Sequence, residues 1–207
     1  MKHVLIGTAA ALACAGALAG AAGAQDAPPA GDYTLDKNHA SVTWRVNHLG
    51  TSNYVARFDE FDAALSFDPA APETSTLSVT IDVTSLSLDF TNGDAFYDEL
   101  MGNDGDERFF RAAEFPTVTF EASGIDVTGE NTGTVTGDLT FMGQTRPLTL
   151  DVTYNGSRTG FGGGAPVIGF SGTTTVTRSE WGMDALVPAI GDEVEVWIEA
   201  EFIAPEA

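Results

Sequence analysis

Two histidines, His39 and His48, are the residues best suited to chemistry, and they bracket a single predicted strand. They lie nine residues apart, and an odd separation on a regular strand places the two rings on opposite faces. A zinc site needs three or four ligands, which here would have to include scattered carboxylates. We therefore predict no metal site and no other cofactor. Each ring is expected to hydrogen-bond to backbone at a strand end, with contact to the polar head group of a ligand as the alternative.

Two arginines, Arg146 and Arg178, stand out because cations are scarce, with 9 Lys and Arg against 30 Asp and Glu. Guanidinium groups bind anionic groups such as a pyrophosphate through paired hydrogen bonds. Either arginine could therefore meet an anionic head group at the mouth of a cavity. A salt bridge to a nearby carboxylate is the alternative, and it is the interpretation that we favour for both.

The sequence contains no recognisable motif for covalent catalysis. There is no G-x-S-x-G nucleophile motif, and Cys14 is the only cysteine. The glycine-rich run at 160–164 has the composition of a phosphate loop, but neither a helical pattern nor a lysine follows it. We predict a protein that is not an enzyme.

A set of apolar residues, rich in aromatic rings, falls mostly on the alternate positions that face a predicted interior, with Phe109 and Phe110 at the predicted helical segment and Trp181 in a loop after Arg178. Any one of them is better explained as core packing than as a ligand contact. Together they supply the dry wall that a hydrocarbon-binding cavity needs. The predicted cavity residues are Trp44, Val46, Phe61, Leu65, Phe67, Ile81, Phe109, Phe110, Phe120, Leu139, Phe141, Phe170 and Trp181.

Strands with one apolar and one polar face must position these residues. Residues 135–154 show this pattern on both sides of a turn, with apolar residues at alternate positions, as in a β-hairpin. Gly143 can take a positive φ in the turn, and Pro147 lies at the start of the second strand, where a missing N–H costs least. The same alternation recurs along the chain and predicts about eight strands of eight to ten residues.

Residues 94–111 interrupt the strand pattern. Apolar residues there recur at helical spacing, and glycines break the run. We expect one or two helical turns, a loop, another turn near residues 109–110, and extended structure again after Pro116.

Strands of this kind form either a sandwich or a closed barrel, and closure is favoured because it removes exposed edges and can enclose one small ligand. An outer-membrane barrel, with its apolar face outward, would show the same alternation. It would also place most of the 30 carboxylates in a narrow lumen, which is electrostatically untenable. The sequence therefore predicts an all-β, antiparallel, up-and-down, lipocalin-like barrel whose apolar face points inward, with one short helical insertion.

The N-terminal residues are typical of a secretory leader. Residues 1–24 carry a basic start, an alanine-rich apolar run and a small-x-small cleavage site, which predicts a signal peptide. Residues 25–31 are a tether and residues 32–204 the barrel domain. Lipidation at Cys14 is the alternative to removal of the leader. The net charge of −21 excludes nucleic acid and stable insertion into anionic membranes as partners.

Five stretches resemble motifs of the YceI-like family of exported lipid-binding proteins. Residues 36–50, DKNHASVTWRVNHLG, are similar to the family's D-x-x-H-S-x-(aliphatic)-x-F-x-V-x-H-(aliphatic)-G. The others are RFDEFDAALSFD at 57–68, RFFRAAEFPTVTF at 108–120, GDLTFMGQTRPLTL at 137–150 and TRSEWGM at 177–183. They occur in order between residues 33 and 202. Ala40 departs from the usual Ser, and Ala56 and Ala63 depart from the usual Gly.

The resemblance implies a barrel whose long apolar cavity holds a polyisoprenoid or another long-chain amphiphilic lipid in the bacterial periplasm, with secretion as the alternative. It implies transport or sequestration without catalysis, with His39, His48 and Arg178 as candidate head-group contacts. Two other functions stay open. One is an isomerase or hydratase acting on a lipid in the same cavity, and the other is a ligand-free structural or stress protein with a filled core. The oligomeric state is also open, with a homodimer among the options.

Overall fold

The computed structural model describes residues 27–89, 93–103, 105 and 107–205. The predicted signal peptide, including Cys14, lies outside the described residues. The predicted tether is described from residue 27 onward. Every account of a contact or a partner below refers to these residues.

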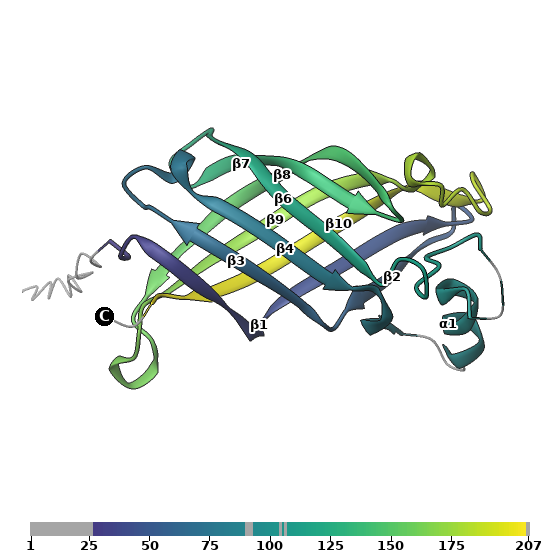
Figure 1. Ribbon diagram of the computed structural model, residues 1–207, viewed down its shortest axis with the longest axis horizontal. Coiled ribbons are helices and arrows are strands. Elements are labelled where there is room, and N and C mark those ends of the chain that lie inside the picture. Colours follow the sequence, from purple (N-terminus) through teal and green to yellow (C-terminus); the bar gives the residue numbers. More distant parts are fainter. Residues whose placement is uncertain (1–26, 90–92, 104, 106, 206–207) are drawn as a thin grey trace, which may run out of the picture.

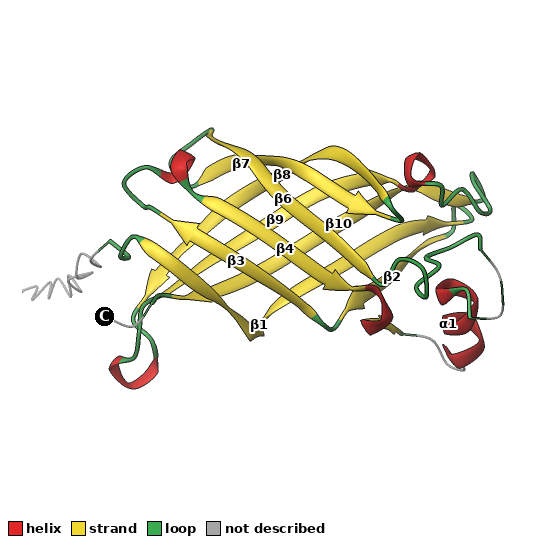
Figure 2. Ribbon diagram, viewed as in Figure 1, coloured by secondary structure: helices red, strands yellow, loops and turns green. Residues whose placement is uncertain are grey.

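The described chain folds into ten antiparallel strands and one α-helix (Figures 1 and 2). The strands are β1 (Gly31–His48), β2 (Ser52–Phe58), β3 (Phe61–Phe67), β4 (Thr76–Asp82), β5 (Leu86–Leu88), β6 (Thr117–Val127), β7 (Thr132–Phe141), β8 (Gln144–Arg158), β9 (Val167–Thr177) and β10 (Ile190–Ile203). The α-helix is α1 (Gly93–Met101), and short 3-10 turns are η1 (Pro72–Thr74), η2 (Val83–Ser85), η3 (Phe161–Gly163) and η4 (Arg178–Trp181).

These ten strands form a closed barrel of eight, because two of the eight positions are each occupied by a strand that is split in two. β2 and β3 pair with successive parts of β1, and β5 continues the path of β4 after η2. Each strand neighbours the next in the chain, and β10 pairs with β1 to close the ring. The predicted up-and-down barrel is confirmed.

The predicted hairpin is β7 and β8. Met142 (φ 47°) and Gly143 (φ 71°) form its two-residue turn, as in a type I′ turn, whose twist matches that of the strands it joins. A Cβ on Gly143 would lie 2.6 Å from a ring carbon of Phe115, so this position has room only for glycine. Pro147 lies near the start of β8, opposite Asp138.

The predicted helical insertion is α1, which ends at Met101 before Gly102 (φ 76°). Strand β6 begins directly after Pro116, as expected. The second turn was predicted at residues 109–110 and lies instead at 112–114. The reason is that Phe110 donates its N–H to the carbonyl of Leu100, which holds this stretch against the end of α1.

The barrel has two distinct ends (Figure 1). The helix end carries α1, the turns after β1 and β7, and the loop at 178–189 between β9 and β10. The terminal end carries the start of β1, the end of β10, and the loops after β3, β6 and β8. No helix among the described residues has the length and apolar character needed to cross a membrane.

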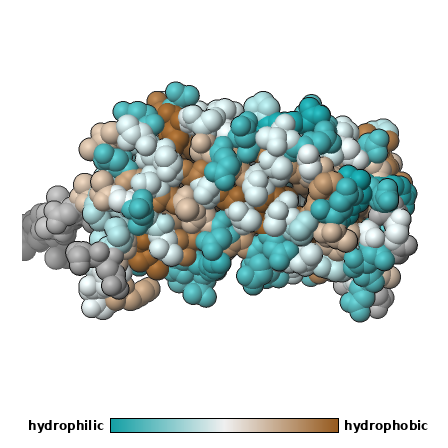
Figure 3. All heavy atoms as spheres, viewed as in Figure 1, coloured by the Kyte–Doolittle hydropathy of each residue, from teal (hydrophilic) through white to brown (hydrophobic). Residues whose placement is uncertain are grey.

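Apolar side chains face the inside of the barrel, and most charged ones face outward. The buried residues form two clusters, one extending to the helix end and one at the terminal end. Arg178 is the one charged residue buried among the described residues. Figure 3 shows polar residues over most of the visible face, with hydrophobic residues visible between them near the middle. The predicted inward orientation of the apolar face is therefore confirmed.

Candidate functional site

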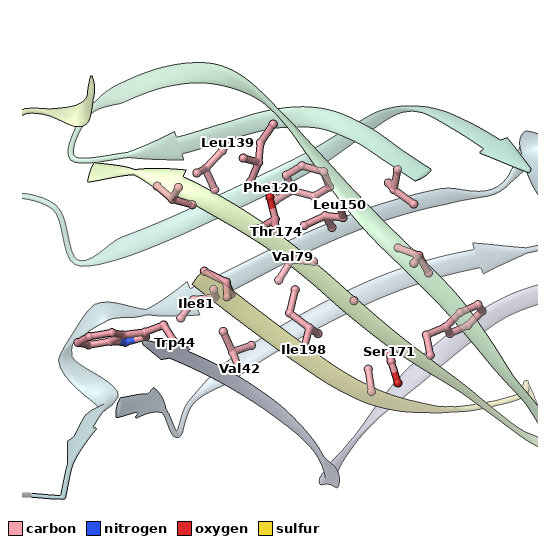
Figure 4. Close-up of a pocket in the computed structure, with 18 of the residues that line it drawn as sticks. Val42, Trp44, Val79, Ile81, Phe120, Leu139, Leu150, Ser171, Thr174 and Ile198 are labelled. Carbon is pink, nitrogen blue, oxygen red and sulfur yellow. The ribbon is translucent and has the colours of Figure 1, made fainter. Parts of the chain in front are cut away.

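An elongated cavity of about 750 Å³ lies inside the barrel. Its wall includes residues from the helix end, such as Phe96 and Leu100, and residues of the β6–β7 turn at the terminal end, such as Asn131. Figure 4 shows Val79, Phe120 and other side chains that line this interior. The cavity therefore extends between the two ends, and the side chains of the barrel leave it open.

The structure places twelve of the thirteen predicted cavity residues in this wall. They are Trp44, Val46, Phe61, Leu65, Phe67, Ile81, Phe109, Phe110, Phe120, Leu139, Phe141 and Phe170. Their contact with a ligand stays a prediction. Trp181 is absent from the wall because it is buried behind it, with its ring centroid 6.4 Å from that of Phe141.

The sequence-based prediction missed several wall residues, notably Tyr54 and Phe58 of β2. Tyr54, Ala56 and Phe58 do alternate inward, and that alternation could have identified the strand. Val55, an exposed apolar residue on the opposite face, hides the pattern. Val79, Leu150 and Ile198 also line the cavity (Figure 4) and belong to strands that were predicted.

A cluster of aromatic rings narrows the terminal end of the cavity. The ring of Phe67 lies 5.7 Å from that of Phe170 and 6.2 Å from that of Tyr154. Tyr154 and Phe170 lie 5.4 Å apart, and Phe170 also contacts Phe202 at 6.2 Å. These spacings are those of packed aromatic pairs. The four rings therefore form one packed cluster at this end.

At the helix end, α1 covers a second row of rings. Trp44 contacts Tyr54 with ring centroids 6.1 Å apart, and Tyr54 contacts Phe96 of α1 at 6.0 Å. The hydroxyl of Tyr97 donates a hydrogen bond of 2.6 Å to the carbonyl of Thr84 in η2. The helix is thus held over the cavity by both apolar and polar contacts.

Arg178 lines the cavity at the helix end, but its guanidinium is committed to the backbone. It donates four hydrogen bonds to the carbonyls of Gly191 (2.8 Å), Met183 (2.7 Å), Ala185 (2.9 Å) and Ile190 (3.1 Å). Burial lowers the pKa of Arg178 from its usual value, and Asp192 and Asp184 oppose this shift. These hydrogen bonds hold the loop between β9 and β10 and take the place of the salt bridge that we favoured. Contact of Arg178 with a ligand head group stays a prediction.

Arg146 lies behind the cavity wall rather than at its mouth. Its guanidinium carbon lies 5.7 Å from the ring centroid of Trp181, and it donates a hydrogen bond of 3.1 Å to the side-chain carbonyl of Gln144. A cation over an indole face is a favourable arrangement. This contact takes the place of the salt bridge that we expected.

The two histidines occupy different sites. His48 lies at the edge of the cavity, whereas His39 lies outside it and hydrogen-bonds to the carboxylate of Asp36 at 2.9 Å instead of to backbone. Asp36, His39 and Glu201 bring their ligand atoms within 4.8 Å of one another. Arg158 already holds the Glu201 carboxylate at 2.7 Å, so this group is explained as an ion-pair cluster between β1, β8 and β10.

Removing the His39 ring is expected to lower stability in a pH-dependent way. The hydrogen bond from His39 is the main reason that the pKa of Asp36 lies below its usual 3.8. A depressed carboxyl pKa stabilises the fold above the unfolded value and loses that effect as the pH falls through the folded value. We expect His39→Ala to cost about 0.5 kcal/mol near pH 6, and the difference to shrink below pH 3.8.

Urea unfolding across this pH range measures the effect, and His48→Ala serves as the control without the Asp36 contact. A His39→Ala deficit that stays constant down to pH 3 or so would contradict the assigned linkage.

Ionisable groups are few in the described wall of the cavity. Beside His48, Arg178 and two tyrosines, it includes Glu99 of α1, Asp126 near the end of β6 and Glu130 in the β6–β7 turn. Between the ends, the wall consists mainly of aliphatic and aromatic side chains, with Ser171 and Thr174 as uncharged polar exceptions (Figure 4). Such a space suits an extended apolar chain, because each buried methylene is favourable wherever it lies.

Comparison with known proteins gives a consistent result. The sequence model of the YceI-like domain matches residues 33–202. A relative called UPF0312 protein from Pseudomonas fluorescens (strain SBW25) is 35% identical over 162 residues, covering 77% of this chain and 80% of the relative.

Solved structures share the barrel. BcnA of Burkholderia cenocepacia superimposes with a TM-score of 0.67 at 25% identity, covering 81% of this chain and 98% of BcnA. A polyisoprenoid binding domain from Saccharophagus degradans superimposes with a TM-score of 0.60 at 14% identity, covering 84% of this chain and 98% of that domain. At that identity, the second likeness shows the fold alone.

Proposed function

This chain belongs to the YceI-like family, and from that premise we propose that it carries or sequesters a long-chain amphiphilic lipid of isoprenoid type. The lipid occupies the barrel cavity with its tail enclosed, and the protein binds it without transforming it. The single observation that supports this most strongly is the open apolar cavity of about 750 Å³.

The cavity is large enough to bind a lipid tail tightly. One water-sized group occupies about 30 Å³, so the space holds on the order of twenty-five methylene-sized groups. Burying fifteen to twenty carbons is worth roughly 12–16 kcal/mol at about 0.8 kcal/mol each. Association and ordering cost about 4–15 kcal/mol. The balance supports micromolar to nanomolar affinity from the tail alone.

The comparisons support the same class of ligand. The Saccharophagus degradans domain is described as polyisoprenoid-binding, so in that protein this architecture serves a ligand with a long branched tail. The open cavity disfavours the alternative of a ligand-free protein with a filled core. The few ionisable wall residues lie toward the two ends of the cavity, and this supports binding rather than catalysis.

We place the mature protein in the bacterial periplasm. The proposal rests on the signal-peptide pattern of residues 1–24 and on the family's motifs. The barrel domain at 32–204 contains the whole family match at 33–202. The acidic surface of the protein repels anionic lipid head groups, so the protein does not stay bound to an anionic membrane surface.

Native mass spectrometry of the protein purified from its own host tests the proposal. We expect a mass excess over the polypeptide, and organic extraction of the same sample should release a long-chain amphiphile. A protein that carries no lipid from its host, and binds none when long-chain isoprenoid alcohols are added in detergent, would contradict the function.

A further inference from the structure

Two polar atoms in the cavity wall have no hydrogen-bond partner among the described residues. They are the indole Nε1 of Trp44 and the hydroxyl of Tyr54, and both atoms are buried. Thr174, another polar wall residue, differs because its hydroxyl donates a hydrogen bond of 2.8 Å to the carbonyl of Thr149. Buried donors without partners destabilise a fold and are rare in native proteins. A ligand that supplies an acceptor would explain both.

The two donors lie on one face of neighbouring strands at the helix end. Trp44 and Tyr54 belong to two inward-facing pairs of β1 and β2, Trp44–Ala56 and Val46–Tyr54, which are separated by one outward-facing pair. Their ring centroids lie 6.1 Å apart, and Phe96 of α1 contacts Tyr54 at 6.0 Å. The two residues that carry these donors therefore lie together in the cavity wall beneath α1.

The charges around this place favour a neutral ligand group. Burial, with a smaller contribution from Asp89, raises the pKa of Tyr54 above its usual value, so its hydroxyl stays protonated as a donor. Glu99 of α1 adds a carboxylate to the same end of the wall. Arg178, the cation in the described wall, donates its hydrogen bonds to backbone. An anionic head would meet repulsion here without a free positive partner.

We propose that Trp44 and Tyr54 form a head-group subsite at the helix end, which binds a neutral hydrogen-bond acceptor such as the carbonyl oxygen of the lipid. A carbonyl oxygen has two lone pairs and can accept from both donors. The tail then runs along the apolar cavity toward the aromatic cluster at the terminal end. This inference rests on the proposed lipid-binding function and adds the orientation and the head-group chemistry of the ligand.

Binding of three matched probes to wild type, Trp44→Phe, Tyr54→Phe and the double variant tests the subsite. The probes are the methyl ketone, the alkane and the carboxylate of one twenty-carbon chain, each competed against a fluorescent fatty-chain reporter. We expect the ketone-to-alkane affinity ratio to fall about fivefold in each single variant and further in the double variant, as for loss of one and two neutral hydrogen bonds. Wild type should also bind the ketone more tightly than the carboxylate.

A matched control is Phe120→Leu, which trims the wall without removing a polar atom. It should weaken ketone and alkane alike and leave their ratio unchanged. A double variant with the wild-type ratio would overturn the subsite, and tighter binding of the carboxylate would overturn its neutral character. If wild type binds none of the probes, the proposed function fails as well. Binding without head-group selectivity defeats the subsite alone.

Discussion

Replacing Gly172 with phenylalanine should reduce affinity for a long-chain ligand about a thousandfold while stabilising the barrel. Gly172 is a buried residue of β9 that lines the cavity, and a Cβ there would lie 3.6 Å from the Cβ of Ile198, an ordinary contact. The ring would extend into the space that we assign to the tail. Displacing on the order of five methylene groups removes about 4 kcal/mol of binding, which is roughly three decades in Kd.

Gly169→Phe is the matched control on the same strand. Gly169 lies on the alternate face of β9, and its added Cβ would meet only the Cβ of Asn155 at 3.6 Å. Both variants remove a glycine from a strand, which favours folding by about 0.5–1 kcal/mol. Only Gly172→Phe should lose the ligand. Titration with a long-chain isoprenoid alcohol and urea unfolding measure the two effects, and equal affinity in both variants would place the tail elsewhere.

The barrel could be predicted because its physical cause is local. A closed sheet with a dry lumen requires inward apolar residues at every second position, and the stretches at 61–67, 76–82 and 132–158 show this directly. The same periodicity led to most of the twelve predicted residues that line the cavity, since a residue that faces inward in such a barrel also borders its cavity.

Strand length was underestimated because irregular pairing hides continuity. β1 has 18 residues, β8 has 15 and β10 has 14. The pairing of β1 with β10 shifts between Leu35 and Ala40, and that of β8 with β9 shifts between Tyr154 and Gly156. Each shift changes which alternate residues face inward. A strand of fourteen residues tilted by about 40° spans roughly 35 Å along the barrel axis, so a longer tail fits than strands of ten residues would allow.

The conformation of the helix end could not be predicted, because it is determined by side-chain contacts between loop segments whose sequences have no periodicity. Trp181 and Arg178 follow β9 in a loop, where no pattern says which side chain faces the lumen. The sequence also gives no reason to expect that one guanidinium binds four carbonyls of the loop and of β10.

Arg178→Met should destabilise the protein by about 3–5 kcal/mol, the cost of disrupting a buried charged network. The side chain is 4% exposed, and its four acceptors would be left without their donor in a buried place. Arg178→Lys should recover little of this loss, because an ammonium group cannot reproduce the planar fork of donors. Urea unfolding of the full barrel measures the change.

Arg45→Met is the control, because the guanidinium of Arg45 is also hydrogen-bonded but its side chain is only half-buried, at 36% exposure. It contacts Glu195 at 2.6 Å and the ring of Trp197 at 4.4 Å, and its loss should cost about 1 kcal/mol or less. The segment that Arg178 holds contributes Met183, Leu186 and Ile190 to the cavity wall. These side chains should become more mobile only in Arg178→Met. That variant should therefore also release a bound lipid faster. Unchanged stability with faster release would instead mean that Arg178 acts on the ligand directly, as a head-group residue.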